Sequence, residues 1–286
     1  MKTIVIAGEG SYIGTHLQEY LRQQTDVYAV KVYPTVGIDP QSFDISGTDA
    51  VINVAAIVHR KETPETLDLY YSVNQDFAIN LAKKAKEENV PLFIQFSTMS
   101  VYGKQTGIIT KDSPLHPVTA YAKSKLEAER GLASLVDDHF AVSILRPPMV
   151  YGPGAKGNYH LLEKLTDYLF FCPTFQNKRS LVSIDHLCKA VYKCIQDARS
   201  GIFFPQDPFP ISTVSLIEQI AACKGKKLRK TSIFNPLIKF LTATTGMGKK
   251  AFGNLLYQDL FELPLSSIYA EDDSKKAIED HAFVSF

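Results

Sequence analysis

The sequence predicts an α/β fold: a doubly wound parallel sheet with a smaller C-terminal lobe. Two observations carry this prediction. Through the first half of the chain, short apolar runs alternate with helix-length segments, and each run is apolar at both alternating sets of positions, as strands buried on both faces should be. After Arg146 the pattern loosens into a loop that contains Pro147, Pro148, Gly152, Pro153 and Gly154.

Five runs rich in Val, Ile and Phe are expected to form the strands of the sheet. They cover residues 4–7, 28–32, 50–55, 92–97 and 141–146. Helices are expected at 63–88 and 118–135. In the first of these helices one face is shared by Leu67, Tyr71, Asn74, Ala78 and Leu81. Strands that alternate with helices predict a parallel sheet covered on both faces.

The second half predicts further elements. Helices are expected at 159–169, 184–196 and 214–223, and a strand at 201–204. Asp185 and Thr213 are expected to cap the last two of these helices. Residues 235–257 are apolar and helical in pattern, although glycines interrupt them.

The predicted domain division follows from this pattern. Residues 1–155 are expected to form the sheet domain, with 181–205 returning to it. Residues 156–180 and 206–286 are expected to form the smaller lobe.

Composition excludes several classes of protein. The net charge of +1 gives no overall attraction to nucleic acid or membrane, and the run Lys226, Lys227, Arg229 and Lys230 is interpreted as a solvated turn. The four cysteines lack metal-ligand spacing and indicate idle thiols in a reducing compartment. His59 and His160 also lack a metal partner, so no metal site is predicted. No apolar stretch approaches about 20 residues, so a cytoplasmic protein without membrane insertion is expected.

A glycine-rich turn follows the first strand directly. It reads Gly8-Glu9-Gly10-Ser11-Tyr12-Ile13-Gly14 and leads into a helical segment. Glycine lets the backbone approach phosphate oxygens, and a helix N-terminus offers N–H groups and a positive dipole end. Such glycines can also simply turn the chain, but their place between strand and helix favours a pyrophosphate site. The sequence therefore predicts a Rossmann-type domain that binds NAD or NADP.

The second strand lacks the acidic residue that would bind the ribose 2′-hydroxyl and repel a 2′-phosphate. It ends Val30-Lys31-Val32-Tyr33. Lys31 could face such a phosphate or remain a solvated surface lysine, and Asp39 from the neighbouring loop could supply a ribose contact.

Tyr121 and Lys125 stand four positions apart in a helical segment, which places them on one face. An ammonium beside a phenol is expected to lower the tyrosine pKa toward neutrality, which makes proton transfer possible. A helix-surface pair is the structural alternative. Ser97 and Thr98 end a predicted strand, where they could face the ligand crevice or cap the chain.

These motifs together resemble the extended short-chain dehydrogenase/reductases of the sugar-nucleotide epimerase/dehydratase group. The resemblance covers about residues 1–220 and rests on the glycine turn, Asn53-Val54-Ala55-Ala56, Asn74, Phe96-Ser97-Thr98-Met99-Ser100-Val101-Tyr102-Gly103, Tyr121-Ala122-Lys123-Ser124-Lys125, and Leu145-Arg146-Pro147-Pro148-Met149-Val150-Tyr151-Gly152-Pro153-Gly154. Residues 178–185 match a later family segment. The resemblance implies a dinucleotide in the large lobe and a nucleotide-sugar between the lobes.

The resemblance also implies residue roles. Thr98, Tyr121 and Lys125 are the expected catalytic residues. The expected cofactor site consists of Gly8, Gly10, Ser11, Tyr12, Ile13, Gly14, Lys31, Asp39, Ala55, Ala56, Ser97, Tyr121, Lys125 and Pro148. The expected substrate contacts are Thr98, Asn158 and Arg179, where the guanidinium of Arg179 would hold a diphosphate. Asn158 could equally cap a helix, and Asn74 could tie its helix to the neighbouring strand or support the active site.

Two departures from the family pattern stand out. Ser11 occupies the place of the middle glycine of the turn, and its small side chain should preserve phosphate binding. The chain has no tryptophan and lacks the leucine-glycine-tryptophan segment of the family near its C-terminus.

Three functions remain after the motifs are compared. Met99 and Ser100 follow Thr98 where dehydratases carry Asp-Glu, so a dehydratase is disfavoured. A 4-epimerase is favoured over an NADPH-dependent keto-sugar-nucleotide reductase, and both over a silent cofactor-binding or scaffold protein. By analogy with the family, a homodimer is expected.

Overall fold

The computed structural model describes residues 1–24, 28–58 and 60–258. The chain divides into two compact units. Unit 1 comprises 1–103, 115–147 and 184–205, and unit 2 comprises 104–114, 148–183 and the described residues from 206 onward.

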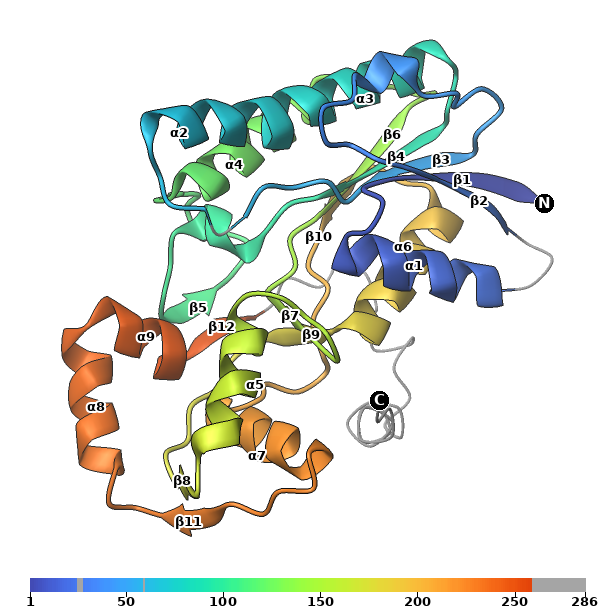
Figure 1. Cartoon of the computed structure of the whole chain (residues 1–286). Helices are drawn as coiled ribbons and strands as arrows, with labels where there is room; N and C mark the ends of the chain where they lie inside the picture. Colours follow the sequence, from blue (N-terminus) through green and yellow to red (C-terminus); the bar gives the residue numbers. More distant parts are fainter. Residues whose placement is uncertain (25–27, 59, 259–286) are drawn as a thin grey trace. The chain divides into compact units, whose positions relative to one another are not determined.

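Unit 1 is built on a six-stranded parallel sheet (Figure 1). The strands follow the spatial order β10-β6-β4-β3-β1-β2. Their bounds are Lys2–Ala7 for β1, Tyr28–Tyr33 for β2, Ala50–Asn53 for β3, Leu92–Phe96 for β4, Ala141–Leu145 for β6 and Gly201–Phe203 for β10. Every residue of β3 and β4 is buried, which explains their unbroken apolar sequences. The predicted α/β fold with a parallel sheet is confirmed.

Helices cover both faces of this sheet (Figure 1). On one face α1 (Tyr12–Gln23) packs against α6 (Ile184–Asp197), and on the other α3 (Phe77–Glu87) packs against α4 (Ala120–Ala133). Since β1 lies between β2 and β3, the chain leaves β1 first to one side and then to the other. The carboxyl ends of β1 and β3 therefore form the switch point at which such sheets bind ligands.

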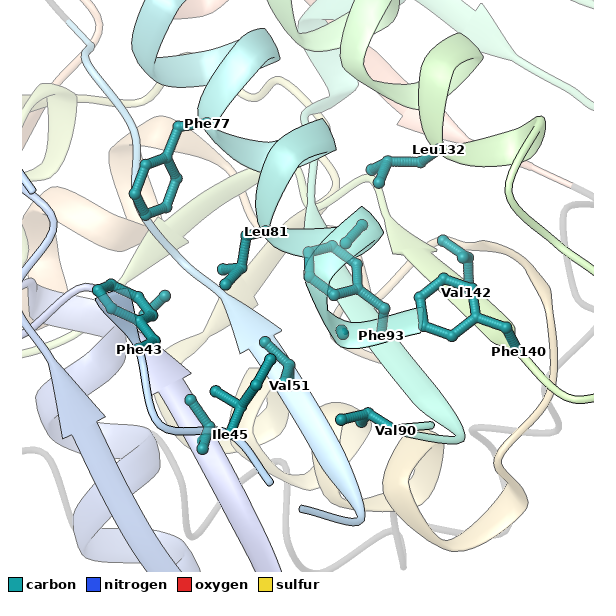
Figure 2. Packing of buried hydrophobic residues seen from close by; sticks show 14 of the residues in the cluster. Phe43, Ile45, Val51, Phe77, Leu81, Val90, Phe93, Leu132, Phe140 and Val142 are labelled. Carbon is teal, nitrogen blue, oxygen red and sulfur yellow. The ribbon is translucent and has the colours of Figure 1, made fainter. Parts of the chain in front are cut away.

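The core of unit 1 lies between the sheet and the helices α3 and α4. Figure 2 shows Phe93 of β4 among Leu81, Leu132 and Val142, which come from α3, α4 and β6. Phe93 and Leu81 are fully buried. Apolar contacts among α3, α4 and the strands β1, β3, β4 and β6 thus fix α4 on the sheet.

The predicted helix at 63–88 contains a π-helical turn. It runs as α2 (Pro64–Tyr71), the π turn at Ser72–Asp76 and α3. The predicted buried face holds from Asn74 onward but is wrong at its start, where Leu67 is exposed, Tyr71 is half-buried and Tyr70 is buried. The wider π turn shifts the faces of the two flanking helices relative to each other, which a constant period cannot anticipate.

Unit 2 combines short parallel strand pairs with four helices. The pairs are β5 (Gly107–Ile109) with β12 (Leu255–Tyr257), β7 (Met149–Tyr151) with β9 (Leu181–Ser183), and β8 (Phe171–Pro173) with β11 (Arg229–Thr231). The helices are α5 (Asn158–Tyr168), α7 (Thr213–Cys223), α8 (Asn235–Thr244) and α9 (Gly246–Phe252). One core cluster joins Tyr151, Leu181, Leu216 and Ile220.

Several sequence expectations differ from the structure in unit 2 and at its borders. Residues 104–114 belong to unit 2 and not to the sheet domain, because β5 pairs with β12. Unit 2 also begins at 148 rather than 156, and the chain returns to unit 1 at 184 rather than 181. Ser212, not Thr213, caps α7 through a hydrogen bond from the Ser215 amide. Gly157 occupies the N-cap of α5, so Asn158 is no cap.

Further corrections concern α6 and the segment 235–257. Asp185 lies within the first turn of α6 rather than before it. The segment 235–257 forms α8, α9 and β12. A Cβ atom on Gly248 would lie 2.2 Å from the Leu241 carbonyl oxygen, so this glycine permits the close approach of the two helices.

The described residues contain no group of metal-binding side chains and no helix long and apolar enough to cross a membrane. All four cysteines are free, and Cys223 is the exposed one. His160 lies beside Glu163, and His59 falls outside the described residues.

Two leucines on the predicted face test this description. Leu81→Ala should lower the free energy of unfolding by about 2–5 kcal/mol because it opens a cavity in the core. Leu67→Ala should cost less, about 1 kcal/mol or below, since Leu67 is 38% exposed and its removal opens no cavity in the core. Urea unfolding measures both, and equal losses would contradict the shift at the π turn.

Candidate active site

The turn between β1 and α1 is packed too closely for side chains at two positions. A Cβ atom on Gly8 would lie 2.5 Å from a Val54 methyl carbon, and one on Gly14 would lie 2.7 Å from the Gly8 carbonyl oxygen. A Cβ atom on Gly10 would meet nothing within 4 Å, so that side of the turn is open. The backbone is therefore bare where a ligand can approach the helix N-terminus.

Ser11 closes the turn where the family pattern has a glycine. Its hydroxyl donates to the Gly8 carbonyl at 2.7 Å and accepts from the Gly14 amide at 3.1 Å, which makes it the N-cap of α1. Tyr12 and Ile13 then form the first turn of the helix. The helix N-terminus and the open side at Gly10 fit the diphosphate of a dinucleotide.

The polar residues near the end of β2 are engaged with each other. The Lys31 ammonium lies 3.4 Å from the Asp44 carboxylate in an exposed ion pair. A hydrogen bond from Ser46, followed by Lys31, holds the pKa of Asp44 below its usual value. The Asp39 carboxylate accepts from the Gln41 amide and caps the 3₁₀ turn Pro40–Ser42. The sequence did not indicate Asp44, whose carboxylate would compete with a 2′-phosphate for Lys31.

The loop after β3 lies against the glycine turn. The Val54 amide donates to the Ala7 carbonyl, and the Ala55 amide donates to the Asn53 side chain at 3.1 Å. A Cβ on Gly8 would come within 3.3 Å of the Ala55 amide nitrogen. The structure thus brings the predicted cofactor residues Gly8 and Ala55 together, with Ala56 next in the chain.

Tyr121 and Lys125 lie on successive turns of α4, whose N-cap is Thr119. The Thr98 side chain lies near enough to the Tyr121 hydroxyl to lower its pKa. Thr98 ends the segment that follows β4, and its hydroxyl also accepts from the Ser100 amide at 3.1 Å. The structure confirms that Thr98 caps a turn, and its role toward a ligand stays a prediction.

Lys125 is fully buried, and its ammonium points to the backbone of two strand ends. It donates to the Phe96 carbonyl at 2.9 Å and to the Ala55 carbonyl at 3.4 Å. The lysine therefore links α4 to β4 and to the loop that adjoins the glycine turn.

Burial, rather than mutual attraction, dominates the titration of this pair. It raises the pKa of Tyr121 to about 12, an effect that the hydrogen bond from Thr98 partly offsets. It lowers the pKa of Lys125 to about 7, against the attraction of Glu129. The expectation that Lys125 brings the Tyr121 pKa toward neutrality is wrong for this structure, since its hydrogen bonds go to carbonyl groups. At neutral pH Tyr121 is a neutral phenol.

A buried ion pair lies one turn beyond Lys125. The Glu129 carboxylate receives two hydrogen bonds from the Arg146 guanidinium, at 3.0 and 2.5 Å, and a third from the Ser97 hydroxyl. Arg146 also donates to the Tyr102 hydroxyl at 2.8 Å. Sequence reasoning missed Glu129, although its spacing of four from Lys125 places a carboxylate on the same helix face.

Asn74 connects the π turn to the site. Its amide group donates to the Ile57 carbonyl at 3.1 Å and to the Ser124 hydroxyl at 3.1 Å, and its oxygen accepts from the Ile57 amide at 2.8 Å. It therefore ties its helix both to the loop after β3 and to α4, next to Lys125.

The remaining predicted residues belong to unit 2. The Arg179 guanidinium donates to the Gly253 carbonyl at 2.8 Å, and burial lowers its pKa. Asn158 begins α5, and Pro148 precedes β7. Their roles toward a ligand stay predictions.

With the nucleotide-binding turn and the strand-end residues described, comparison with known proteins identifies the class. Residues 4–203 match the NAD dependent epimerase/dehydratase family, and the chain belongs to this family. Its members are NAD-dependent epimerases and reductases of nucleotide-sugars, as the motifs predicted.

Individual relatives agree with this assignment. The chain is 33% identical over 252 residues to the UDP-glucose 4-epimerase of Vibrio cholerae, covering 79% of this chain and 76% of the relative. It is 23% identical to the N-acetyl-alpha-D-glucosaminyl-diphospho-ditrans,octacis-undecaprenol 4-epimerase of Escherichia coli O157:H7, covering 82% and 76%.

Solved structures share the fold. UDP-glucuronic acid 4-epimerase from Bacillus cereus, in complex with NAD, superposes with a TM-score of 0.71 at 20% identity and covers 98% of this chain and 96% of its own. The dTDP-4-dehydrorhamnose reductase of Bacillus anthracis, in complex with NADP, gives 0.68 at 17% identity, covering 94% and 93%.

The buried ion pair should be essential for stability. Glu129→Gln leaves the Arg146 guanidinium buried without its counter-charge and should lower the free energy of unfolding by about 3–5 kcal/mol. Glu127→Gln on the same helix breaks an exposed pair with Arg130 and should cost about 0.5 kcal/mol or less. Chemical unfolding compares the two, and similar values would contradict the assigned role of Glu129.

The pKa of Lys125 predicts a pH dependence of stability. Between its folded value of about 7 and its ordinary value of 10.5, the unfolded chain binds more protons, so this lysine makes the free energy of unfolding rise with pH. The slope should approach about 1.4 kcal/mol per pH unit. Lys125→Met should abolish this contribution, and Lys123→Met, at an exposed position of α4, should retain it. An unchanged slope in Lys125→Met would contradict the pKa.

Proposed function

We propose that this chain is a nucleotide-sugar 4-epimerase that uses NAD and acts on a UDP-hexose. The observation that carries the proposal is the position of Lys125, which is buried and hydrogen-bonded to the strand ends that adjoin the glycine turn, with Tyr121 one turn earlier on the same helix and Thr98 near its hydroxyl. The Vibrio cholerae relative, a UDP-glucose 4-epimerase, supports the choice of substrate and reaction.

Tyr121 is the proposed acid/base. Its hydroxyl, held by Thr98, would exchange a proton with the sugar C4 oxygen as this carbon passes through a keto stage and returns with the opposite configuration. NAD, when bound, supplies the hydride acceptor, and its positive charge favours the phenolate of a neighbouring tyrosine. With a pKa of about 12, Tyr121 begins as a proton donor, so its ionisation must be promoted before it can accept the C4 hydroxyl proton.

Lys125 and Thr98 are the proposed positioning groups. The lysine ammonium holds the Phe96 and Ala55 carbonyls together, which fixes the strand ends against the turn where the cofactor would bind. Thr98 orients the tyrosine hydroxyl and would contact the substrate oxygen. Ser97 is held by Glu129 and supports Thr98 from the adjacent position.

The proposed cofactor site uses the turn from Gly8 to Gly14, Ala55 and Ala56. Lys31 forms an exposed ion pair with Asp44, so a 2′-phosphate would compete with this carboxylate for the lysine. This competition weakens the argument for NADP and for a keto-sugar reductase. In unit 2, Arg179 and Asn158 are proposed for the diphosphate and the sugar, and Pro148 for the cofactor.

Cofactor content of the purified protein separates the two reactions. An epimerase regenerates NAD in every cycle and has no need to release it, whereas a reductase must exchange one reduced cofactor per turnover. Mass spectrometry of the denatured protein should detect bound NAD close to one per chain. Purification without cofactor, followed by stoichiometric consumption of NADPH with a keto sugar, would favour the reductase.

Replacement of the tyrosine should separate chemistry from binding. Tyr121→Phe should lower kcat for interconversion of the C4 epimers by roughly 10²–10⁴-fold, since it removes the proton-transfer group and keeps the ring. NAD content should stay unchanged. Tyr168→Phe, at an exposed position of unit 2, is the matched control. A Tyr121→Phe variant with near-parental turnover would exclude Tyr121 as the acid/base.

A further inference from the structure

Unit 2 contains a segment whose charge differs sharply from that of the whole chain. The sequence as a whole is balanced, with 31 basic and 30 acidic residues, yet residues 219–258 contain no aspartate or glutamate. The basic residues of this segment are Lys224, Lys226, Lys227, Arg229, Lys230, Lys239, Lys249 and Lys250. Ion pairs join Lys224 to Asp167 at 2.6 Å and Lys230 to Glu218 at 2.9 Å. Even with these two pairs the segment keeps a positive surface.

The same segment exposes large apolar side chains along α8 and its ends. We call these residues the α8 face: Ile233, Phe234, Leu237, Phe240, Leu241 and Met247, all of them exposed. Leu237, Phe240 and Leu241 have helical spacing and share one side of α8, while Ile238 is buried on the adjacent side. Phe240 is 63% exposed and Met247 84% exposed, which is unusual for grouped apolar residues.

Cations also lie beside aromatic rings at the strand pair of β8 and β11. Arg229 of β11 is the register partner of Phe171 of β8, and Phe171 is exposed. The Lys226 ammonium lies 5.2 Å from the centroid of the Phe170 ring. Figure 1 shows that β11 leads directly into α8, so the basic strand and the α8 face are continuous along the chain.

We infer that the α8 face docks unit 2 onto an anionic membrane surface. Apolar and aromatic side chains on one side of a helix, flanked by lysines and arginines without carboxylates, have the composition of helices that lie in the lipid interface. The apolar side chains would enter the headgroup boundary while the cations meet lipid phosphates. No helix in the described part of the chain can span a bilayer, so the contact is peripheral.

Other occupants suit this surface less well. A second copy of the chain would set two surfaces with an excess of positive charge against each other, which is unfavourable. A nucleic acid would use the cations and leave Leu237, Phe240 and Leu241 without apolar partners. The basic run at 226–230 is interpreted from its sequence as a solvated turn. In this proposal its cations also bind lipid phosphates, next to the apolar side chains of α8.

Vesicle flotation of the full-length protein tests this inference. The protein should bind phosphatidylcholine vesicles that contain phosphatidylglycerol, bind vesicles of phosphatidylcholine alone far more weakly, and dissociate at high salt. Leu237→Ser/Phe240→Ser should reduce the partition coefficient by about tenfold or more. Leu67→Ser/Val136→Ser, which alters exposed apolar residues of unit 1, is the matched control and should bind like the parent.

A second set of variants reverses charges in the same vesicle experiment. Lys239→Glu/Lys250→Glu should weaken binding to the anionic vesicles by about tenfold, and Lys83→Glu/Lys123→Glu, at exposed positions of unit 1, should not. Failure of the parent to bind, equal binding to neutral vesicles, or equal loss in the control variants would overturn the inference. A further result would also overturn it: a parent that is a dimer and binds no vesicles, and a Leu237→Ser/Phe240→Ser variant that is a monomer. That result would assign the α8 face to contact with a second copy.

Discussion

The buried pair of Glu129 and Arg146 is the interaction on which the candidate site depends. Each ion loses its hydration when the chain folds, and only the complete set of hydrogen bonds compensates for this loss. Because Arg146 follows β6 and Glu129 lies on α4, the pair fixes the helix at the carboxyl end of the sheet. Ser97, which directly follows β4, donates to the same carboxylate, so the ends of β4 and β6 and helix α4 meet at one charge.

This anchor sets the positions of the groups that carry chemistry. Lys125 lies one turn before Glu129 on α4 and Tyr121 two turns before, so their places follow from the helix once Glu129 is fixed. Asn74 adds a second tie through Ser124, and Lys125 itself bonds to the backbone of two strand ends. Tyr121 is therefore positioned near Thr98 by a framework in which Asn74, Lys125 and Glu129 all have hydrogen-bond partners.

The same burial shapes the proton chemistry. Partial loss of water around the Tyr121 phenol and full burial of the Lys125 amine both oppose charging, which moves the pKa of Tyr121 up and that of Lys125 down. The lysine then titrates near neutral pH, and the tyrosine keeps its proton. In the proposed reaction the chain supplies a poised donor with fixed geometry, and the charge of the bound cofactor helps to form the phenolate.

Local patterns in the sequence predicted the features that depend only on residues close together along the chain. The glycine turn, the strand ends and the spacing of Tyr121 and Lys125 needed only strand and helix periods and the chemistry of phosphate binding. Contacts between distant residues escaped prediction. Asp44 pairs with Lys31 across a loop, Glu129 finds Arg146 on another element, and β5 joins β12 from far along the chain. The π turn at 72–76 escaped because a constant period cannot indicate an inserted residue.

The central claim is that a sugar C4 hydrogen leaves and returns as hydride while Tyr121 moves the hydroxyl proton. Proton NMR of a UDP-hexose incubated with the NAD-saturated protein in deuterium oxide tests it directly. The account predicts inversion at C4 with the original hydrogen retained on that carbon. Incorporation of solvent deuterium at C4 would show that the hydrogen leaves as a proton, and would contradict the account.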